Sequence, residues 1–251
     1  MWEAGFKKMT VNDLGGRHVN YLVDRWKREA LAVGTIKNRM TTLRWWGEKV
    51  NRPVMRAENG AYGIGKRTLV TNISKSKSLP AKQLALVTDE RVRLSLELQR
   101  EFGLRREESL KFRPSYADRG DRIALKASWT KGGRAREIPI LTPAQREVLN
   151  RAHALAGLGS LIPIERNYIQ QIKIYERQTA AAKLSKMHGL RHCDAQRRYE
   201  ELTGWQSLNN DGPNSKALTP EQKRVDRSAR LQISQELGHG RESITAVYLG
   251  R

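Results

Sequence analysis

The chain has 251 residues, enough for one or two domains with a substantial hydrophobic core. Lysine and arginine number 47 against 26 acidic residues, which gives a formal net charge of +21. No apolar run approaches the roughly 20 residues that span a bilayer, and residues 1–8 lack the apolar stretch of a secretory signal. A single cysteine, Cys193, excludes a disulfide scaffold and a cysteine-based zinc site. These features exclude a transmembrane protein and predict a protein of the reducing cytoplasm.

The positive charge indicates the class of partner. A surplus of 21 positive charges attracts polyanions, and it would be costly self-repulsion without one. The basic residues are spread along the whole chain, which favours a folded protein that grips a long polyanion from several sides. Nucleic acid is therefore the expected partner, ahead of a membrane surface or a merely basic enzyme. We expect its binding to weaken steeply with salt.

The first fifty residues predict a small helical domain. Apolar residues at helical spacing indicate an amphipathic helix over residues 18–26. After an interruption at Gly34, a second helix is expected to begin with Thr35 as its cap. The pair Trp45 and Trp46 in this helix is interpreted as core. Basic residues between its apolar positions are candidates for nucleic-acid binding: Lys37, Arg39, Arg44 and Lys49.

A basic stretch rich in glycine, asparagine and serine follows between residues 52 and 80. Helical periodicity fades there, which predicts a linker over residues 71–83. Lys75 and Lys77 within it are further candidates for nucleic-acid binding. The glycine-rich part lacks the GxxxxGK[ST] spacing of a phosphate-binding loop, so no nucleotide site is predicted.

From Leu84 the pattern returns to helices and is then broken by a predicted β-hairpin. Residues 122–129 and 136–140 flank the pair Gly132 and Gly133, and we expect them to form its two strands. Hairpins of this kind place the side chains of their turn at the surface.

The remainder of the chain is predicted to be mainly helical. Thr142 as cap and Pro143 at the first helical position indicate the start of a further helix. Residues 206–220 are the exception, because their asparagine, aspartate, glycine, proline and serine content is typical of a loop. The sequence contains no internal repeat.

Several short features carry side chains suited to phosphate chemistry. Each alone has an ordinary interpretation, such as a surface salt-bridge cluster, a solvated turn lysine or a packed histidine. In chain order they are Gly103-Leu104-Arg105-Arg106-Glu107-Glu108, Lys131 on the hairpin, His188-Gly189-Leu190-Arg191-His192, Leu237-Gly238-His239, and Tyr248 nine positions later.

Taken together, this ordered series resembles the tyrosine recombinase (phage integrase) family. The similarity covers residues 84–251 as the catalytic domain, and residues 1–70 are similar to the family's helical, SAM-like core-binding domain, with residues 71–83 as the linker. The resemblance implies a mainly α fold with a small β-sheet or hairpin (α+β).

The resemblance also implies an activity and its partners. The expected protein is a site-specific DNA recombinase or integrase of a mobile genetic element, acting on double-stranded DNA in the bacterial cytoplasm and associated with the nucleoid. Four protomers would assemble on DNA and exchange strands through a Holliday junction, with accessory DNA-bending or directionality proteins as further partners. No cofactor and no membrane are expected.

By this resemblance Tyr248 is the nucleophile. Its attack on the scissile phosphate would give a 3′-phosphotyrosyl link and a free 5′-hydroxyl, which saves the phosphodiester energy for rejoining. Arg105 and Arg191 would hold the non-bridging oxygens, because a guanidinium stays ionised and donates bidentate hydrogen bonds. His239 would add a third donor.

Two proton movements remain. His188 fits the role of base or proton relay, and Lys131 that of a general acid delivered on the hairpin. No metal is expected, because the cationic side chains supply the positive charge and the sequence shows no clustered acidic set that would hold two metals.

Residues beside these motifs have structural interpretations. Glu108 is expected to orient an arginine or to be buried, His192 to cap or pack, and Cys193 to be a small buried residue of the same helix. Other tyrosines compete as nucleophile only if the resemblance is false: Tyr168, Tyr175 and Tyr199.

Two features depart from the family pattern. The gap between Arg191 and His239 is longer than usual, and a loop-like insert over residues 206–227 accounts for it. Such an insert leaves the active site intact if it loops outward, and its role stays open. Three residues follow Tyr248, whereas many relatives carry a further segment that packs on a neighbouring protomer, so the linkage of protomers stays open as well.

Three other functions are compatible with these residues. A type IB-like topoisomerase would share the tyrosine chemistry without synapsis of two sites. A non-catalytic DNA-binding protein could retain the fold. A basic RNA-binding protein is disfavoured by the lack of an aromatic RNP-like pattern.

Overall fold

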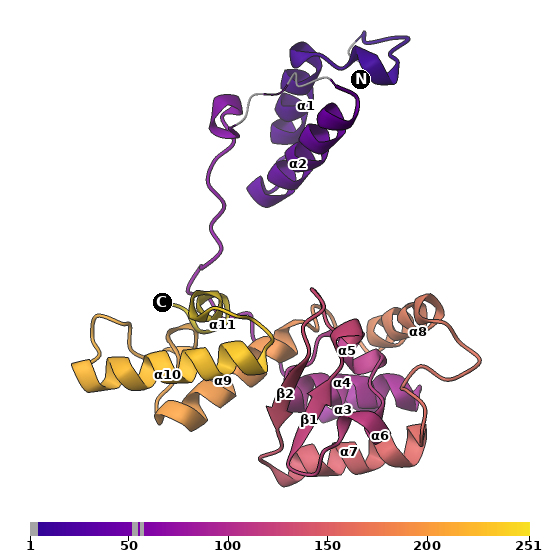
Figure 1. Cartoon of the computed structure of the whole chain (residues 1–251), viewed down its shortest axis with the longest axis vertical. Helices are drawn as coiled ribbons and strands as arrows, with labels where there is room; N and C mark the ends of the chain where they lie inside the picture. Colours follow the sequence, from indigo (N-terminus) through magenta and orange to yellow (C-terminus); the bar gives the residue numbers. More distant parts are fainter. Residues whose placement is uncertain (1–4, 52–54, 56–57) are drawn as a thin grey trace. The chain divides into compact units, whose positions relative to one another are not determined.

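The computed structural model describes residues 5–51, 55 and 58–251. These residues are mainly helical with one two-stranded antiparallel sheet, which confirms the predicted fold class. The chain divides into two compact units, Met1–Leu69 and Val70–Arg251. Figure 1 labels their elements. Within the described ranges, no helix combines the length and the apolar character needed to cross a membrane.

The first unit is built on two helices. Its elements are η2 (Val11–Asp13), α1 (Gly16–Arg28), α2 (Val33–Lys49) and η3 (Gly60–Tyr62). The apolar face predicted for residues 18–26 is confirmed, since Val19, Val23 and Trp26 of α1 pack against Ile36 and Met40 of α2. Burial of these two stripes is what holds such short helices together.

Helix α2 begins earlier than predicted. The backbone N–H of Thr35 donates to the carbonyl of Ala32 at 2.8 Å, so Ala32 is the cap and Gly34 lies inside the helix. The interpretation of both tryptophans as core is wrong for one of them. Trp46 packs against the apolar cluster, whereas Trp45 is 58% exposed because it falls on the opposite face.

The second unit holds the remaining elements. They are α3 (Ala81–Ala85), α4 (Glu90–Phe102), α5 (Arg106–Leu110), α6 (Pro114–Ala117), β1 (Arg122–Leu125), η4 (Ala127–Trp129), β2 (Arg136–Pro139), α7 (Pro143–Ala156), α8 (Tyr168–Ala181), α9 (Gly189–Thr203), η5 (Leu208–Asn210), α10 (Pro220–Glu236), η6 (Glu242–Thr245) and α11 (Ala246–Leu249).

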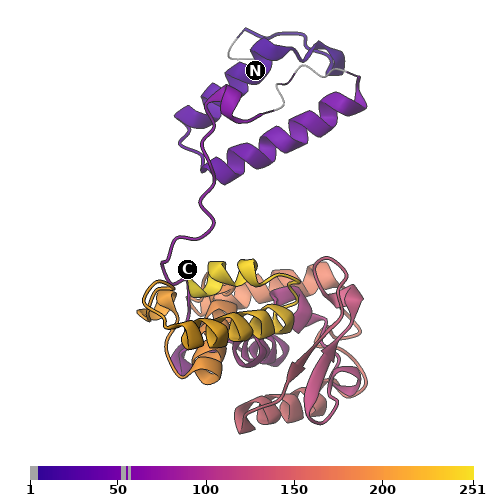
Figure 2. The same cartoon turned by 60° about the vertical axis from the view of Figure 1, so that its left-hand side comes forward.

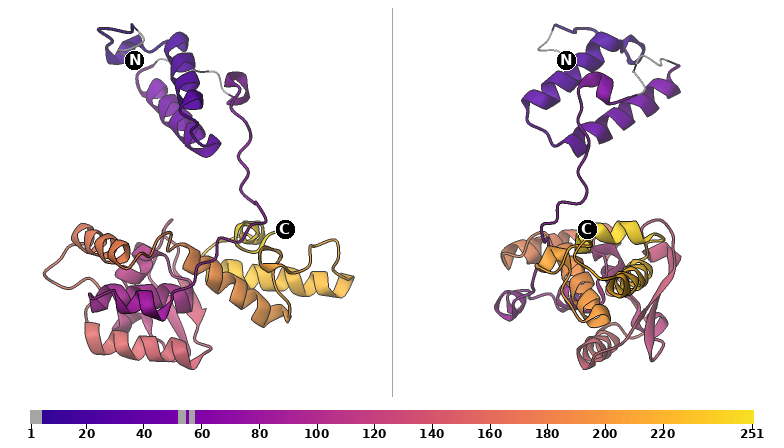
Figure 3. Two further views of the ribbon diagram at one scale, coloured as in Figure 1. Left: turned by 180° about the vertical axis from the view of Figure 1, so that it is seen from behind. Right: turned by 90° about the vertical axis from the view of Figure 1, so that its left-hand side faces the viewer.

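Helix α4 lies at the centre of this unit. One side of it packs against α7, and the other side contacts α8 and α9 (Figure 3). Leu94 and Leu98 belong to the first apolar cluster, while Val92 and Leu96 belong to the second. A helix that is apolar on both sides needs neighbours on both sides, so α4 fixes the relative positions of the elements around it.

The predicted hairpin is confirmed as an antiparallel pair with Ile123 opposite Ile138. Its first strand is shorter than expected, because residues 127–129 form η4 and turn Trp129 into the core. Strand β2 lies beside the end of α10 (Figure 2). The cap predicted at Thr142 is confirmed by a hydrogen bond from the backbone N–H of Gln145 to its hydroxyl.

The segment predicted as a linker makes specific contacts within the second unit. The backbone N–H of Lys77 donates to the carbonyl of Gly189 at 3.1 Å, and Ser74 bonds to Gln196 of α9. Leu79 is buried in the same cluster as Leu84. This stretch is therefore ordered by the start of α9.

The predicted insert is also more structured than a loop. Helix α10 already begins at Pro220, so the last part of the expected 206–227 insert is helical. The cap at Thr219 and the proline at the first helical position explain this start, as at Thr142. Residues 204–219 are the non-helical part, apart from η5, and η5 packs inward against α11.

Candidate active site

Residues distant in sequence meet at one cavity of about 730 Å³ in the second unit. Its lining includes five of the six predicted active-site side chains: Arg105, Lys131, His188, His239 and Tyr248. The sixth, Arg191, is buried and donates a hydrogen bond to the hydroxyl of Tyr248. The structure thus brings all six together from α5, the hairpin loop, α9, the end of α10 and α11.

Arg105 is positioned by the turn between α4 and α5. Gly103 ends α4 in the left-handed conformation, which places Arg105 as the cap of α5. Its backbone N–H and its Nη1 both donate to the Glu108 carboxylate at 2.7 Å. Glu108 therefore orients Arg105 toward the cavity, as the sequence predicted.

Glu108 holds a second arginine that sequence reasoning missed. Arg136 of β2 donates both Nη atoms to the carboxylate, at 2.9 and 2.7 Å, and its Nε donates to the carbonyl of Glu236. Burial alone would raise the pKa of Glu108, but hydrogen bonding and the charge of Arg136 lower it to about 2. The signal in the sequence is the alternation of the strand, because Arg136 lies two positions before the apolar Ile138 and so shares its inward face. The structure pairs Arg136 with the buried Leu125.

Arg191 is the most enclosed member of the site. The side chain is 1% exposed and donates to Tyr248 at 3.4 Å, to the carbonyl of Gly103 at 2.6 Å and to the carbonyl of Leu237. Burial, together with nearby Arg105, lowers its pKa to about 10, so it remains charged at neutral pH. A fixed positive charge therefore lies next to the tyrosine, with Cζ of Arg191 5.9 Å from the centroid of its ring.

Tyr248 lies among cationic and imidazole groups. Its hydroxyl is 3.4 Å from Nε of Arg191 and 3.4 Å from Nε2 of His239. The ring of His192 packs against the phenol with the centroids 4.6 Å apart. His192 thus has the packing role expected of it. The tyrosine is 5% exposed and lines the cavity.

The competing tyrosines are placed elsewhere. Tyr175 bonds to Gln99, and Tyr199 donates to Asp226. Burial raises the pKa of each phenol to about 12, which makes both poor nucleophiles at neutral pH. Neither they nor Tyr168 lines the cavity that holds Tyr248.

The histidines of the site are held in the neutral form. Burial lowers the pKa of His239 to about 4, and the neighbouring positive charge of Arg191 adds to the effect. Burial and the same arginine lower the pKa of His188 as well. A neutral imidazole can accept a proton at one nitrogen and donate from the other, which suits a relay.

Lys131 also lines the cavity, on the loop between the strands. Gly132 and Gly133 follow it with φ of +85° and +66°, a conformation that favours glycine. The space beside both glycines is open, and Lys131 itself is exposed. The loop also adds Arg134 to the cavity lining, a residue that sequence reasoning missed.

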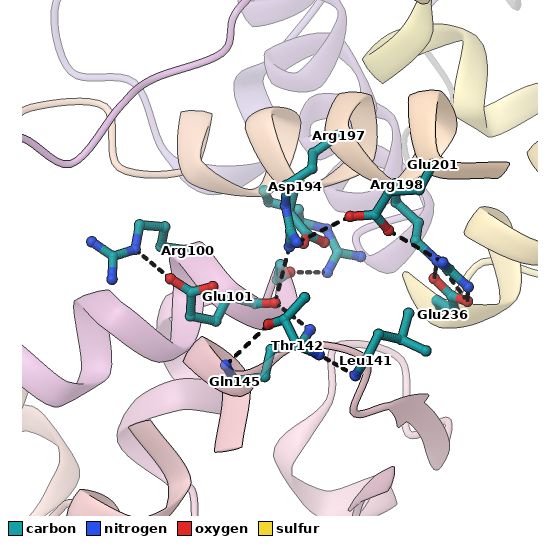
Figure 4. Close-up of polar contacts among 12 residues, drawn as sticks. Arg100, Glu101, Leu141, Thr142, Gln145, Asp194, Arg197, Arg198, Glu201 and Glu236 are labelled. Atoms are coloured by element: carbon teal, nitrogen blue, oxygen red, sulfur yellow. Dashed lines mark hydrogen bonds and ion pairs between the residues drawn. The ribbon is translucent and has the colours of Figure 1, made fainter. Parts of the chain in front are cut away.

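Polar contacts among α4, α7, α9 and α10 brace these helices against one another (Figure 4). Arg197 of α9 and Gln145 of α7 both donate to the carbonyl of Glu101 at the end of α4. Arg198 pairs with Glu236 at the end of α10. These bonds fix α9, and with it His188 and Arg191, against the helices on either side.

Asp194, which sequence reasoning also missed, lies in this braced region three residues after Arg191. It pairs with Arg197 at 2.6 Å and lies against Gly103, where an added Cβ would collide with it. Burial raises its pKa to about 7 in spite of the arginine.

The predicted nucleic-acid contacts fall into two groups. Lys75 and Lys77 line a second cavity of about 400 Å³ together with Lys186 and His188, so they adjoin the active site. The candidates of the first unit all belong to α2: Lys37, Arg39, Arg44 and Lys49.

Comparison with known proteins gives a family and a fold. A family model described as "Integrase" matches residues 65–197, and one described as "Phage integrase, N-terminal" matches residues 1–52. The first match contains Arg105, Lys131, His188 and Arg191 but ends before Tyr248. No curated protein sequence matches the chain.

Solved structures resemble the chain over nearly its whole length. A lambda integrase dimer bound to a COC′ core site has a TM-score of 0.60 at 16% identity, covering 98% of this chain and 67% of that one. XerH recombinase bound to palindromic difH has a TM-score of 0.54 at 15% identity, covering 98% and 72%. The Tn1549 transposon integrase bound to circular intermediate DNA has a TM-score of 0.54 at 12% identity, covering 97% and 83%.

Proposed function

The chain belongs to the integrase family, the tyrosine recombinases, and we propose that Tyr248 is the nucleophile with which it cuts and rejoins duplex DNA. The chain is a tyrosine-type site-specific recombinase. The observation that carries the assignment of Tyr248 is the placement of its hydroxyl, 3.4 Å from both Arg191 and His239 and facing a cavity lined by Arg105 and Lys131.

In the proposed cleavage step the phenolic oxygen attacks phosphorus. The bond from phosphorus to the 5′-oxygen breaks, and the product is a 3′-phosphotyrosyl link with a free 5′-hydroxyl. The phenolic proton passes to neutral His188 or to water that it orders, and Lys131 supplies a proton to the leaving oxygen. Rejoining reverses these transfers with the 5′-hydroxyl of a partner strand as nucleophile.

The transition state gathers negative charge on the non-bridging oxygens. Arg105 lines the cavity, and the Nη1 atom of its guanidinium binds Glu108. The rest of the guanidinium is therefore placed to bind the non-bridging oxygens. Arg191 adds a charge that is already fixed before DNA binds, and such preorganised donors lose no energy to reorientation during the reaction. His239 completes the set as a neutral donor.

Double-stranded DNA is the proposed partner, gripped by both units. The net charge of +21 supports this, and two solved relatives are core-site and Holliday-junction complexes of lambda integrase, the latter a tetramer. We propose that Lys37, Arg39, Arg44 and Lys49 contact the DNA backbone from α2, and that Lys75 and Lys77 do so beside the active site. The proposed setting is a mobile element in a bacterial cytoplasm, with four protomers assembled on two DNA sites.

Covalent trapping tests the proposal. The protein is incubated with a nicked suicide duplex that carries the candidate ends of its own element, and the reaction is quenched in detergent. We expect a DNA–protein adduct that is absent from Tyr248→Phe. An adduct that persists in the variant, or no adduct despite tight binding to that site, would contradict the assignment.

The same reactions separate the remaining alternatives. Relaxation of supercoiled DNA that lacks the site would indicate a type IB-like topoisomerase. Strand exchange that requires two copies of the site indicates a recombinase. A protein for which Tyr248→Phe changes no activity would be a non-catalytic binder.

A further inference from the structure

The helix that carries Tyr248 is too short to hold itself in place. Helix α11 has four residues, Ala246–Leu249, and follows directly on η6. A single turn has little stability of its own, because ordering its backbone costs more free energy than its hydrogen bonds contribute. The position of the tyrosine hydroxyl therefore depends on what holds α11 from outside.

Two side chains hold the main chain of the tyrosine itself. Nε2 of Gln196 and Nδ2 of Asn209 each donate to the carbonyl of Tyr248 at 3.0 Å. Both donors are buried, Gln196 on α9 and Asn209 on η5. Together they occupy both lone pairs of this oxygen, which sets the orientation of α11.

Asn209 belongs to the stretch of chain between α9 and α10. We name residues 204–219 the insert segment. Its first part is tightly folded, because the backbone N–H groups of Asn210 and Gly212 both donate to the carbonyl of Ser207, at 2.8 and 2.9 Å. Its base is anchored where the indole of Trp205 donates to the hydroxyl of Tyr199. The insert segment therefore gives α11 a rigid surface to pack against.

The residue that follows α11, Gly250, packs closely against the insert segment. Gly250 has a φ of +78°, and a Cβ added there would meet Oδ1 of Asn209 at 2.7 Å and Cβ of Leu208 at 3.0 Å. The carbonyl of Gly250 accepts from Nη1 of Arg230 on α10 at 2.9 Å. A glycine is thus required for the chain to approach the insert segment so closely.

We propose that the insert segment is a positioning element for the nucleophile. Asn209, against which Gly250 packs, holds α11 so that the hydroxyl of Tyr248 lies within hydrogen-bond reach of Arg191 and His239. Asn209 does not line the cavity that holds Tyr248, and it acts through the main chain of the tyrosine. The inference rests on the proposed role of Tyr248.

The test compares two asparagines of the same turn. Asn209→Ala removes the donor to Tyr248, whereas Asn210 has an exposed side chain and serves as the matched control. The readouts are the single-turnover rate of adduct formation on the suicide duplex at saturating DNA, and the affinity for that duplex. Misplacing a reacting group by about 1 Å costs about 100-fold in rate. We therefore expect a 10- to 100-fold slower reaction for Asn209→Ala, on the order of that estimate.

A positioning role predicts a specific pattern. DNA affinity and thermal unfolding of Asn209→Ala stay close to those of the wild type, and Asn210→Ala reacts at the wild-type rate. Gly250→Ala tests the same contact from the other side and is expected to slow the reaction with affinity retained.

Other results would overturn the inference. A wild-type rate in Asn209→Ala, or a parallel loss of affinity and folding in both Asn209→Ala and Gly250→Ala, would show that the segment does not position the tyrosine. Failure of the wild type to form an adduct would instead remove the role of Tyr248, so the two failures are distinguishable.

Discussion

The buried and the exposed residues of the site differ in how firmly the fold holds them. Tyr248 and Arg191 are 5% and 1% exposed and are tied to α4, α9 and α10. Lys131 is exposed, on a loop whose glycines have open space around them. The proposed nucleophile and one arginine are thus fixed by the core, while the proposed acid lies on a surface loop. Substitutions of the buried residues should therefore affect both folding and chemistry, and those of residues that line the cavity mainly chemistry.

The largest effect is expected from Arg191→Ala. It removes a proposed transition-state donor, worth about 10³-fold in cleavage rate. It also leaves the carbonyls of Gly103 and Leu237 without their buried donor, at about 1–3 kcal/mol each. Adduct formation and urea unfolding measure the two losses.

Arg105→Ala is the matched control for that prediction. Arg105 lines the cavity, and its partner Glu108 keeps a bidentate bond to Arg136 without it. We expect cleavage to fall by about 100-fold or more with a much smaller change in stability. Equal destabilisation by the two arginine variants would mean that the fold does not hold the buried arginine more firmly than the one that lines the cavity.

Lys131→Ala should slow cleavage by about 100-fold and leave the free energy of unfolding unchanged. This is the lower end of the usual range for a general acid, because water reaches the exposed loop and can supply a proton. Cleavage of a substrate with sulfur in place of the 5′-oxygen should be nearly restored, since a thiolate leaves without a proton. An equal defect on both substrates would exclude the acid role.

Glu108→Gln tests the buried carboxylate that binds both Arg105 and Arg136. Its pKa falls from 4.5 to about 2 on folding, a stabilisation of the ionised form by about 3 kcal/mol. We expect Glu108→Gln to lower the free energy of unfolding by about that amount at pH 7, measured by urea titration.

The pH dependence gives the sign of this effect. Since folding lowers the pKa, the stabilisation is complete above pH 4.5 and is lost as the pH falls toward 2, so the variant and the wild type should converge there. Glu107→Gln is the control, because its carboxylate is about half exposed and pairs with Lys111 at the surface. A deficit that does not shrink in acid would show that the charge of Glu108 is not its cause.

Much of the fold could be predicted from the sequence, because the sequence signals for its helices are local. The helical spacing of residues 18–26 and the threonine–proline start at Thr142 each act within a few residues, and the structure agrees with both. The exposure of Trp45 and the helical Gly34 were missed, because the face that a residue presents depends on where its helix begins.

The ordered motifs by themselves determined the family and the six candidate residues, because a residue type and its order in the chain are properties of sequence. The tertiary structure alone decided how those residues meet: Arg191 reaches Tyr248 across 57 positions only because α4, α9 and α10 pack as they do. It also decided that the insert segment packs inward on α11 and that the buried Arg136 shares Glu108 with Arg105. Such contacts join elements far apart in the chain, and their geometry is set by packing that no local pattern encodes.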